Sequence, residues 1–267
     1  MHSYYIHTLG CKVNQAESDL IMAMLAEAGY HRVELNESPQ WCILNTCTVT
    51  AHSDKKVRQA IRKIKKTNPG SKLAVIGCYP VLNREKAIGM GTDFTAGNQD
   101  KLKAVNFIVQ NTKNIHAHPV HEPPIHSRPL IKVQDGCRQF CSYCIVPIVR
   151  GPYYSRPSAE IIDHINKVAG QGFEEVVLTG IHIGKYGVDL TGGYGLGSLL
   201  EDILSHTGIK RVRISSMEIG EVSHDLIELM AGIGNRICRH LHLPLQSGSN
   251  KVLRLMNRPY SCEYFLE

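Results

Sequence analysis

The sequence lacks any run of roughly 18 apolar residues, the length that a membrane-spanning helix requires. Its N-terminal stretch, MHSYYIHTLGC, also lacks the charged and apolar regions of a secretory signal. With 43% hydrophobic and 20% charged residues, the composition is that of a globular protein. We therefore expect a soluble, cytoplasmic protein that does not contact a membrane.

The nine cysteines do not form the even set that a complete disulfide framework would need. A reducing cytosol also disfavours disulfides, so these residues are expected to be metal ligands or core residues. The formal net charge is +6 and the pI is near 8.8, which is compatible with an acidic partner such as RNA. Many unrelated proteins are equally basic, so charge alone does not identify the partner.

Residues 1–112 alternate short apolar runs with amphipathic patterns. The apolar runs, which indicate strands, are SYYIHTLGC, WCILNTC and KLAVIGC. The patterns that indicate helices are QAESDLIMAMLAEAGY, SDKKVRQAIRKIKKTNPG and QDKLKAVNFIVQ. Ser53 or Asp54 is the expected cap of the second helix. Strands that alternate with helices predict a mostly parallel sheet, and hence an N-terminal α/β domain.

Residues 113–128 are rich in histidine and proline and show no periodicity, which predicts an extended linker, although such a tract can also bind metal. After it, residues 129–267 contain four strand–helix units without a hairpin signal. The expected strands are PLIKVQDGC, EEVVLTGI, KRVRISSME and RHLHLPLQS. The expected helices are SAEIIDHINKVAGQG, SLLEDILSHTG, HDLIELMAGIG and NKVLRLMNR, the first capped by Ser158. This pattern fits an α/β barrel or an open doubly wound sheet, and four units are too few to close a barrel.

Three cysteines lie close together in DGCRQFCSYCIVP: Cys137, Cys141 and Cys144. Their spacing could mark one face of a helix, but Gly136 and Pro147 flank them and a strand has just ended, so a loop is expected. A structural zinc site would need a fourth ligand. Three thiolates on a loop can instead hold a [4Fe–4S] cluster and leave one iron open to bind a small molecule.

Three other cysteines each close one N-terminal strand: Cys11, Cys47 and Cys78. Because the carboxyl ends of parallel strands meet at one edge of a sheet, these thiols are expected to converge and hold a second cluster. Taken singly, each would be an ordinary buried cysteine. Cys42 lies inside its strand and is expected to be a core residue. Cys238 and Cys262 have no partners at ligand spacing and are expected to be structural.

The C-x₃-C-x₂-C motif, with Tyr143 before its last cysteine, resembles the signature of radical S-adenosylmethionine (SAM) enzymes. TLGCKVNQAES, NTCTVT, IGCY and HLHLPLQSGSNKVLRLMNR resemble the methylthiotransferase branch and span nearly the whole chain. GCKVNQ, NTCTVT and RGPYYSRP are most similar to the tRNA N6-threonylcarbamoyladenosine methylthiotransferases. Tyr154 stands where that family more often has an arginine that contacts substrate.

This resemblance implies an enzyme that transfers a methylthio group to C2 of N6-threonylcarbamoyladenosine in tRNA. The cluster on Cys137, Cys141 and Cys144 would bind SAM, and its reduction would yield a 5′-deoxyadenosyl radical that abstracts hydrogen from C2. The cluster on the N-terminal cysteines would carry or deliver the sulfur, which a second SAM methylates. An electron donor and a sulfur donor are implied partners, and no acid–base side chain is needed as principal catalyst.

Other positions match the cofactor pocket of that family: Tyr143, Gly180, Ser216, Glu218 and Gln246. Glu218 is expected to accept hydrogen bonds from ribose hydroxyls, and Gly180 to let the backbone approach the methionine moiety closely. Each of the polar strand-end residues could instead be a helix cap or turn former. Basic residues of KKVRQAIRKIKK are candidate RNA contacts, although such a run is also typical of a solvated helix face: Lys55, Arg58, Arg62 and Lys66.

Family members continue with further barrel units and a small β-rich RNA-binding domain, so the chain is expected to be a truncated form with an incomplete radical SAM (β/α) barrel. Two other targets stay open, isopentenyladenosine in tRNA and a ribosomal protein. An alternative from a different class is an inactive remnant that only binds iron–sulfur clusters.

Overall fold

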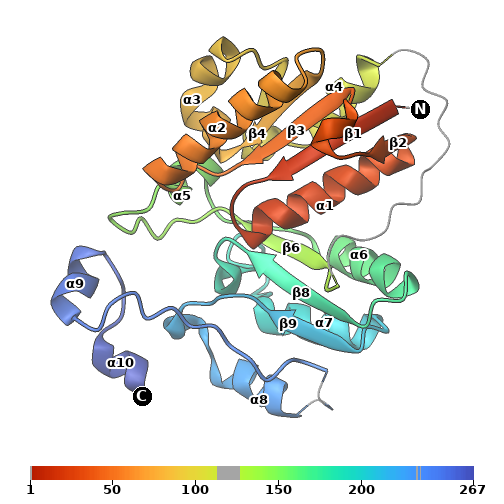
Figure 1. The fold of residues 1–267 in the computed structure, drawn as a ribbon. Coiled ribbons are helices and arrows are strands. Elements are labelled where there is room, and N and C mark those ends of the chain that lie inside the picture. Colours follow the sequence, from red (N-terminus) through yellow and green to blue (C-terminus); the bar gives the residue numbers. More distant parts are fainter. Residues whose placement is uncertain (1, 113–126, 233, 235) are drawn as a thin grey trace. The chain divides into compact units, whose positions relative to one another are not determined.

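A computed structural model describes residues 2–112, 127–232, 234 and 236–267. The chain divides into two compact units, Met1–Ile125 and His126–Glu267 (Figure 1), and each is described by itself. The predicted linker at 113–128 lies outside the described residues except for its last two. Within the described ranges, no helix is both long enough and apolar enough to cross a membrane.

The first unit is built on a five-stranded parallel sheet in the order β2-β1-β3-β4-β5 (Figure 1). Thr8 of β1 pairs with Asn45 of β3, and Thr46 of β3 pairs with Gly77 of β4, so these three strands end in line. The N-terminal parallel α/β sheet predicted from the sequence is confirmed. Its strands are β1 His2–Thr8, β2 Tyr30–Arg32, β3 Trp41–Thr46, β4 Lys72–Gly77 and β5 Phe94–Ala96.

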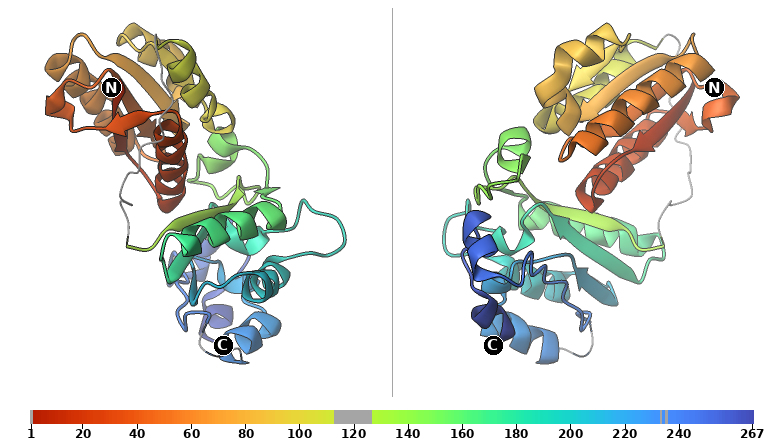
Figure 2. Two further views of the ribbon diagram at one scale, coloured as in Figure 1. Left: turned by 90° about the vertical axis from the view of Figure 1, so that its right-hand side faces the viewer. Right: turned by 60° about the vertical axis from the view of Figure 1, so that its left-hand side comes forward.

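Helices cover both faces of this sheet (Figure 2). Trp41 and Ile43 of β3 pack on one face with α1 (Lys12–Glu27) and α4 (Lys103–Gln110). Cys42 and Leu44, which alternate with them, pack on the other face with α2 (Ala51–Thr67) and α3 (Cys78–Gly89). Burial on both faces explains why β3 is a continuous apolar run instead of an alternating one. Short 3₁₀ turns lie at Leu35–Glu37 and Asn98–Asp100.

Two details of these helices differ from the sequence prediction. Thr50, and not Ser53 or Asp54, caps α2: it has extended backbone and its hydroxyl accepts a hydrogen bond from the Ser53 amide at 3.0 Å. Helix α3 was not predicted, because its short apolar run follows β4 directly and has Pro80 in its first turn. A proline is tolerated there because the first turn of a helix has no backbone acceptor for its amides.

The second unit has a four-stranded sheet in the order β7-β6-β8-β9. β6, β8 and β9 are parallel, whereas β7 is a two-residue antiparallel strand that the sequence did not predict. The core contains apolar residues of β6, β8 and β9 with those of α6 (Ser158–Gly170) and α7 (Leu196–His206). The strands are β6 Leu130–Asp135, β7 Tyr154–Ser155, β8 Glu175–Gly180 and β9 Arg211–Ile214.

The helices of this unit are α5 Val146–Arg150, α6 Ser158–Gly170, α7 Leu196–His206, α8 His224–Gly232, α9 Asn250–Leu255 and α10 Cys262–Leu266. Short 3₁₀ turns lie at Ile183–Lys185 and Ile219–Glu221. Ser158 is the first residue of α6 and not its cap, which is Pro157 and makes no side-chain hydrogen bond.

The fourth strand predicted for this unit, RHLHLPLQS, is wrong. Only an isolated bridge from Val212 to Ile237 pairs this part of the chain with β9, and residues 239–247 are irregular. Pro244 has no amide to donate to a ladder, and Gln246 has a left-handed backbone with φ of 69°. Both features are incompatible with a continuous extended strand, although the apolar alternation of the sequence suggests one.

Candidate functional site

Three thiols lie at the carboxyl edge of the first sheet. Cys11 directly precedes α1, Cys47 directly follows β3, and Cys78 is the first residue of α3, directly after β4. Burial raises the pKa of the Cys47 thiol, and the nearby Cys78 and Cys11 thiols raise it further. The alignment of the three strands therefore brings these side chains within electrostatic range of one another.

No three Cys, His, Asp or Glu side chains in the described part of the chain are arranged around a point where they could hold a single metal ion. A [4Fe–4S] cluster requires a wider arrangement, because each cysteine binds a different iron of the cube. The chemistry of three neighbouring thiols fits that group, and cluster binding at Cys11, Cys47 and Cys78 stays a prediction.

Asn14 fixes the two loops that carry the first two of these cysteines. Its side chain is 1% exposed, and its Nδ2 donates to the carbonyl oxygens of Leu9 and Thr46, each at 2.9 Å. Leu9 lies two residues before Cys11, and Thr46 directly precedes Cys47. Asn14 was not selected from the sequence, where its only signal is its place one helical turn after Cys11.

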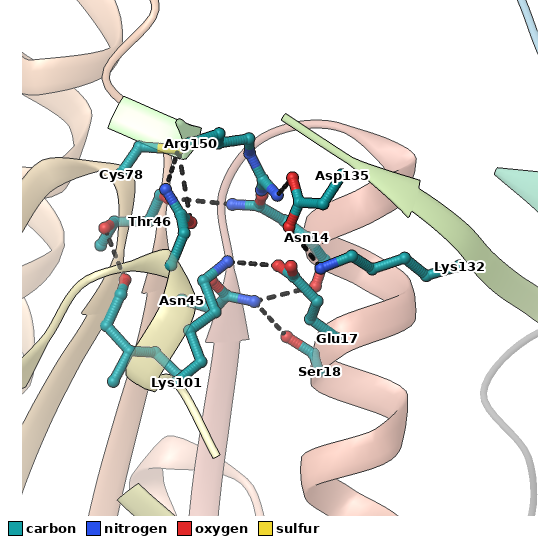
Figure 3. A network of polar contacts seen from close by, with 12 residues as sticks. Asn14, Glu17, Ser18, Asn45, Thr46, Cys78, Lys101, Lys132, Asp135 and Arg150 are labelled. Carbon is teal, nitrogen blue, oxygen red and sulfur yellow. Dashed lines mark hydrogen bonds and ion pairs between the residues drawn. The ribbon is translucent and has the colours of Figure 1, made fainter. Parts of the chain in front are cut away.

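Further buried polar groups of the first unit surround Asn14 (Figure 3). Asn45 donates to the Asn14 carbonyl oxygen at 2.8 Å and to the Ser18 hydroxyl at 2.9 Å, and Lys101 forms a buried ion pair with Glu17. Asn98, also buried, donates from Nδ2 to the Cys78 sulfur at 3.4 Å. This contact fixes the position of the Cys78 side chain at the edge of the sheet.

In the second unit, the loop with Cys137, Cys141 and Cys144 runs from the end of β6 to α5. Asp135 at its start forms ion pairs with Lys132 at 2.5 Å and with Arg150 at 2.9 Å (Figure 3). The Cys137 amide donates to the Gly151 carbonyl oxygen at 3.0 Å, and the Cys144 amide donates to that of Cys141 at 2.9 Å. These contacts fold the loop back on the segment after α5.

The thiols of this loop also influence one another. Burial raises the pKa of Cys141, and the nearby Cys144 and Cys137 thiols raise it as well, whereas the Arg258 guanidinium lowers it. A cavity of about 370 Å³ adjoins the loop. It is lined by Cys137, Arg138, Phe140, Pro147, Gly151 and Pro152.

His182 contacts the first cysteine of the loop. Its Nδ1 lies 3.3 Å from the Cys137 sulfur, and its Nε2 forms an ion pair with the Glu221 carboxylate at 2.5 Å. Burial lowers the pKa of His182, but its hydrogen bonds to Cys137 and Glu221 outweigh this and raise it to about 9. Burial raises the pKa of Cys137, and the contact with His182 outweighs it, so the net shift is downward. His182 directly follows the predicted strand EEVVLTGI, and neither His182 nor its partner Glu221 was selected from the sequence.

Three of the predicted cofactor residues come together around a residue that was not predicted, Arg258. Its Nη1 donates to Glu218 Oε1 at 2.5 Å, and its Nη2 donates to the Tyr143 hydroxyl. That hydroxyl donates in turn to Gln246 Oε1 at 3.2 Å. Tyr143, Glu218 and Gln246 thus form one network, although they are separated by up to 103 residues in the sequence.

The other two predicted cofactor residues lie elsewhere. The Ser216 hydroxyl lies 2.7 Å from His242 Nδ1, and no contact described joins it to the Arg258 network. Gly180 ends β8 beside Gln134, where a Cβ would come within 3.0 Å of the Gln134 side chain. Tyr154 lies on β7 and is 58% exposed.

Two buried polar atoms of the network lack a hydrogen-bond partner within the described ranges: Glu218 Oε2 and Arg258 Nε. Buried polar atoms are almost always paired, so an unpaired acceptor and donor beside the cysteine loop fit a ligand with hydroxyl and acidic groups. These two atoms are therefore candidate contacts for a bound cofactor.

The candidate RNA contacts lie on α2. Val57, Ile61 and Ile64 form its buried face. The positive side chains lie away from that face. Arg58 is half-buried, and the other three are exposed: Lys55, Arg62 and Lys66. The helix therefore presents a basic surface, which is compatible both with phosphate binding and with simple solvation.

Comparisons with known proteins match both units to families. The family described as Radical SAM superfamily matches residues 131–267, and the Uncharacterized protein family UPF0004 matches residues 3–96. The chain also resembles a solved structure in fold, the radical S-adenosylmethionine methyltransferase TsrM from Kitasatospora setae. The TM-score is 0.65 at 14% identity, over 99% of this chain and 64% of that one.

Curated relatives match over nearly the whole chain. The threonylcarbamoyladenosine tRNA methylthiotransferase MtaB of Bacillus subtilis is 37% identical over 100% of this chain and 62% of its own length. MtaB of Aquifex aeolicus is 35% identical over 97% of this chain and 67% of its own length. A tRNA-2-methylthio-N(6)-dimethylallyladenosine synthase of Geotalea uraniireducens is 35% identical over 98% of this chain and 64% of its own length. The chain thus spans about two thirds of the length of these relatives.

Proposed function

This chain belongs to the methylthiotransferase branch of the radical SAM superfamily, and from that membership we propose that it methylthiolates tRNA at C2 of N6-threonylcarbamoyladenosine. The single observation that carries the proposal is the presence of two separate three-cysteine sets, one in each unit. We assign the methylthiotransferase α/β domain to residues 1–112, the linker to 113–128 and the radical SAM domain to 129–267.

Each cysteine set would hold one [4Fe–4S] cluster. Cys137, Cys141 and Cys144 would hold the cluster that binds SAM, because three protein ligands leave one iron open. When bound and reduced, this cluster supplies the electron that cleaves SAM. The second cluster would be held by Cys11, Cys47 and Cys78 and would serve the sulfur transfer.

Side chains of the second unit would bind and orient the cofactor. Glu218 Oε2 is buried and has no hydrogen-bond partner among the residues that the structure describes, and this oxygen would accept a hydrogen bond from a ribose hydroxyl. Arg258 holds the other oxygen of Glu218 and thereby sets the direction of the acceptor. Gly180, which has no side chain, would let the backbone at the end of β8 approach the methionine moiety. Gln246, which belongs to the same network, would add a polar contact to the cofactor, and Ser216, which lies outside that network, would contact the cofactor from the segment after β9.

The nucleic-acid substrate would contact the basic face of α2 through Lys55, Arg58, Arg62 and Lys66, because positive side chains neutralise phosphates. The reaction also needs an electron donor and a sulfur donor as partners. A second candidate substrate is N6-dimethylallyladenosine in tRNA. The relative from Geotalea uraniireducens that is named for this nucleoside is 35% identical to the chain, and so is the MtaB of Aquifex aeolicus.

The test is nucleoside mass spectrometry of tRNA. The chain is expressed in bacterial strains that lack their own methylthiotransferase for one or the other nucleoside, with Cys141→Ala as the matched control. We expect 2-methylthio-N6-threonylcarbamoyladenosine to appear with the wild type and not with the variant. The dimethylallyl product alone would assign the second substrate.

Because the chain spans about two thirds of its relatives, the Bacillus subtilis relative is assayed in parallel in the same strains. Unchanged tRNA with this chain but not with the relative would contradict the proposed tRNA activity of the chain. In that case 5′-deoxyadenosine release by the purified, reduced chain distinguishes the remaining alternatives. Release would favour another target such as a ribosomal protein, and none would favour an inactive iron–sulfur-binding remnant.

A further inference from the structure

The segment Met256–Arg258, which we call the clasp, directly follows α9 and contacts the cysteine loop more than a hundred residues earlier in the chain. The Met256 carbonyl oxygen accepts from the Ser142 amide at 3.2 Å. Asn257 donates from Nδ2 to the Phe140 carbonyl oxygen at 3.1 Å, and Arg258 donates to the Tyr143 hydroxyl. Of the three contacted loop residues, Phe140 and Ser142 flank Cys141, and Tyr143 directly precedes Cys144.

The loop needs such external contacts because little within it is regular. Residues 136–145 form neither helix nor strand, and Phe140 has a left-handed backbone with φ of 47°. A bulky residue adopts that conformation only when surrounding contacts enforce it. The clasp itself has one left-handed residue, Asn257 with φ of 57°, and asparagine tolerates this conformation better than most residues.

Arg258 connects the loop to the cofactor side of the unit. Its side chain is 6% exposed, and its guanidinium lies 5.7 Å from the centre of the Tyr143 ring and 2.5 Å from Glu218 Oε1. A planar guanidinium can serve a hydroxyl and a carboxylate at once, with donors left over. Within the described residues, seven buried side-chain atoms lack a hydrogen-bond partner, and two of them belong to this network: Arg258 Nε and Glu218 Oε2.

We propose that the clasp is a positioning element for the cofactor: Asn257 and Met256 hold the cysteine loop, and Arg258 couples that loop to Glu218. Arg258 therefore fixes the distance between the cluster ligands and the acceptor for the ribose. This inference rests on the proposed function, because it concerns the same SAM site. It adds residues that lie outside the cysteine motif and outside the predicted cofactor set.

The experiment measures SAM affinity on the anaerobically reconstituted full chain by equilibrium dialysis, and on the dithionite-reduced chain by the change in the electron paramagnetic resonance signal when SAM is added. The variants are Arg258→Gln, Arg258→Lys and Tyr143→Phe. The matched control is Arg254→Gln, an exposed arginine on α9, one helical turn earlier. Iron content and circular dichroism are recorded for every variant.

We expect Arg258→Gln to weaken SAM binding by roughly tenfold or more, since a charged hydrogen bond to a buried acceptor is lost. Arg258→Lys keeps the positive charge but lacks the planar guanidinium that contacts two partners at once, and it should weaken SAM binding less than Arg258→Gln. Tyr143→Phe removes only the hydroxyl contact and should weaken binding by roughly threefold, and Arg254→Gln should leave it unchanged. Should Arg258→Gln fail to fold, the SAM affinities of Arg258→Lys and Tyr143→Phe test the role of the clasp.

A wild-type chain that holds iron but does not bind SAM would overturn the proposed function itself. A wild type that binds SAM, with the Arg258 and Tyr143 variants equal to the Arg254 control, would overturn only the clasp. Equal affinity with a changed resonance signal would also overturn it, because the coupling of loop and acceptor must appear in binding.

Discussion

Cysteine residues of this chain acquire different chemistry from their neighbours. Cys42 is fully buried inside β3 among apolar side chains, and burial raises its pKa to about 11. Cys137 contacts a protonatable imidazole, and its pKa is lowered. The contact with His182 thus favours the thiolate form of Cys137, which is the form that binds iron, whereas burial of Cys42 disfavours it. The pKa alone does not separate core cysteines from candidate ligands, because burial also raises the pKa of Cys47 and Cys141.

The first prediction concerns the division of labour between the two cysteine sets. Cys47→Ala should retain reductive SAM cleavage and abolish methylthiolation, because Cys47 belongs to the set proposed for sulfur transfer. Cys141→Ala should abolish both, because no open iron remains in the second unit. The measurement is chromatography of released 5′-deoxyadenosine and of tRNA nucleosides. Loss of cleavage in Cys47→Ala, with the other cluster intact, would mean that the roles are reversed or shared.

A second prediction at this scale concerns Gly136, which opens the cysteine loop. Its φ is 71°, and a Cβ at this position would lie 1.7 Å from the Pro152 carbonyl oxygen. Gly136→Ala must therefore displace the backbone, which should cost several kcal/mol of stability, on the order of 3 kcal/mol, and reduce iron binding at this loop. Gly197→Ala on α7 is the control, since a Cβ there meets nothing within 4 Å. Thermal unfolding and iron assays report both effects, and normal values for Gly136→Ala would refute the steric argument.

Among the elements, α6 shows how a buried polar group can make a helix sensitive to pH. His164 on α6 has Nδ1 3.4 Å from Arg156 Nη1, so the neutral ring can accept a hydrogen bond from the guanidinium. Burial lowers the pKa of His164 to about 4, and the positive charges of Arg156 and Lys167 contribute. The folded unit therefore prefers an uncharged imidazole at a position where the unfolded chain binds a proton near pH 6.5.

A third prediction follows for stability against pH. Because the folded pKa lies below the unfolded value, the unfolded chain binds more protons between pH 6.5 and 4, and stability falls as the pH is lowered through this window. The contribution of His164 alone should fall by about 2 kcal/mol between pH 7.5 and pH 5. His182, whose folded pKa is raised, changes stability in the opposite direction over this range, so the wild type is compared with His164→Gln by urea unfolding of the metal-free chain at both pH values. Between the two pH values the wild type should lose about 2 kcal/mol more than His164→Gln, whereas His206→Gln, at an exposed site, should behave as the wild type; equal slopes in the wild type and His164→Gln would contradict the assignment.

Considered as a whole, the molecule combines two α/β units that each present three thiols on segments following parallel strands. The same principle operates in both, since the carboxyl ends of parallel strands are where ligand sites of such folds lie. The metal content of the whole chain is therefore the most direct measure of the proposed site.

The fourth prediction is that the anaerobically reconstituted chain holds about eight irons, four for each cysteine set. Replacing Cys137, Cys141 and Cys144 together by Ala should leave about four irons, and the same change at Cys11, Cys47 and Cys78 should also leave about four. The triple change of Cys42, Cys238 and Cys262 to Ser or Ala is the matched control and should leave about eight. Zinc in the wild type, or full iron in either of the first two variants, would refute the two-cluster assignment.

The sequence by itself determined the parallel α/β character of both units and the segments on which the cysteines lie. Apolar runs such as WCILNTC and the helical periodicity of Val57, Ile61 and Ile64 are local properties, set by which side chains must be buried. The rule that parallel strands end at one edge then turns three distant cysteines into neighbours. Sequence patterns failed where local features competed, as in residues 239–247, where Pro244 and the left-handed Gln246 override an alternating apolar pattern.

Only the tertiary structure decided which polar side chains meet. Arg258 with Tyr143 and Glu218, His182 with Glu221, and Asn14 with the Thr46 carbonyl group are contacts between segments that are far apart in the sequence. Such pairs have no periodicity, because they depend on strand register and on how loops close. Hydrogen bonds need donors and acceptors within about 3 Å, a precision that burial patterns do not carry. Spacing thus assigned the candidate ligands, and long-range packing selected the residues that surround them.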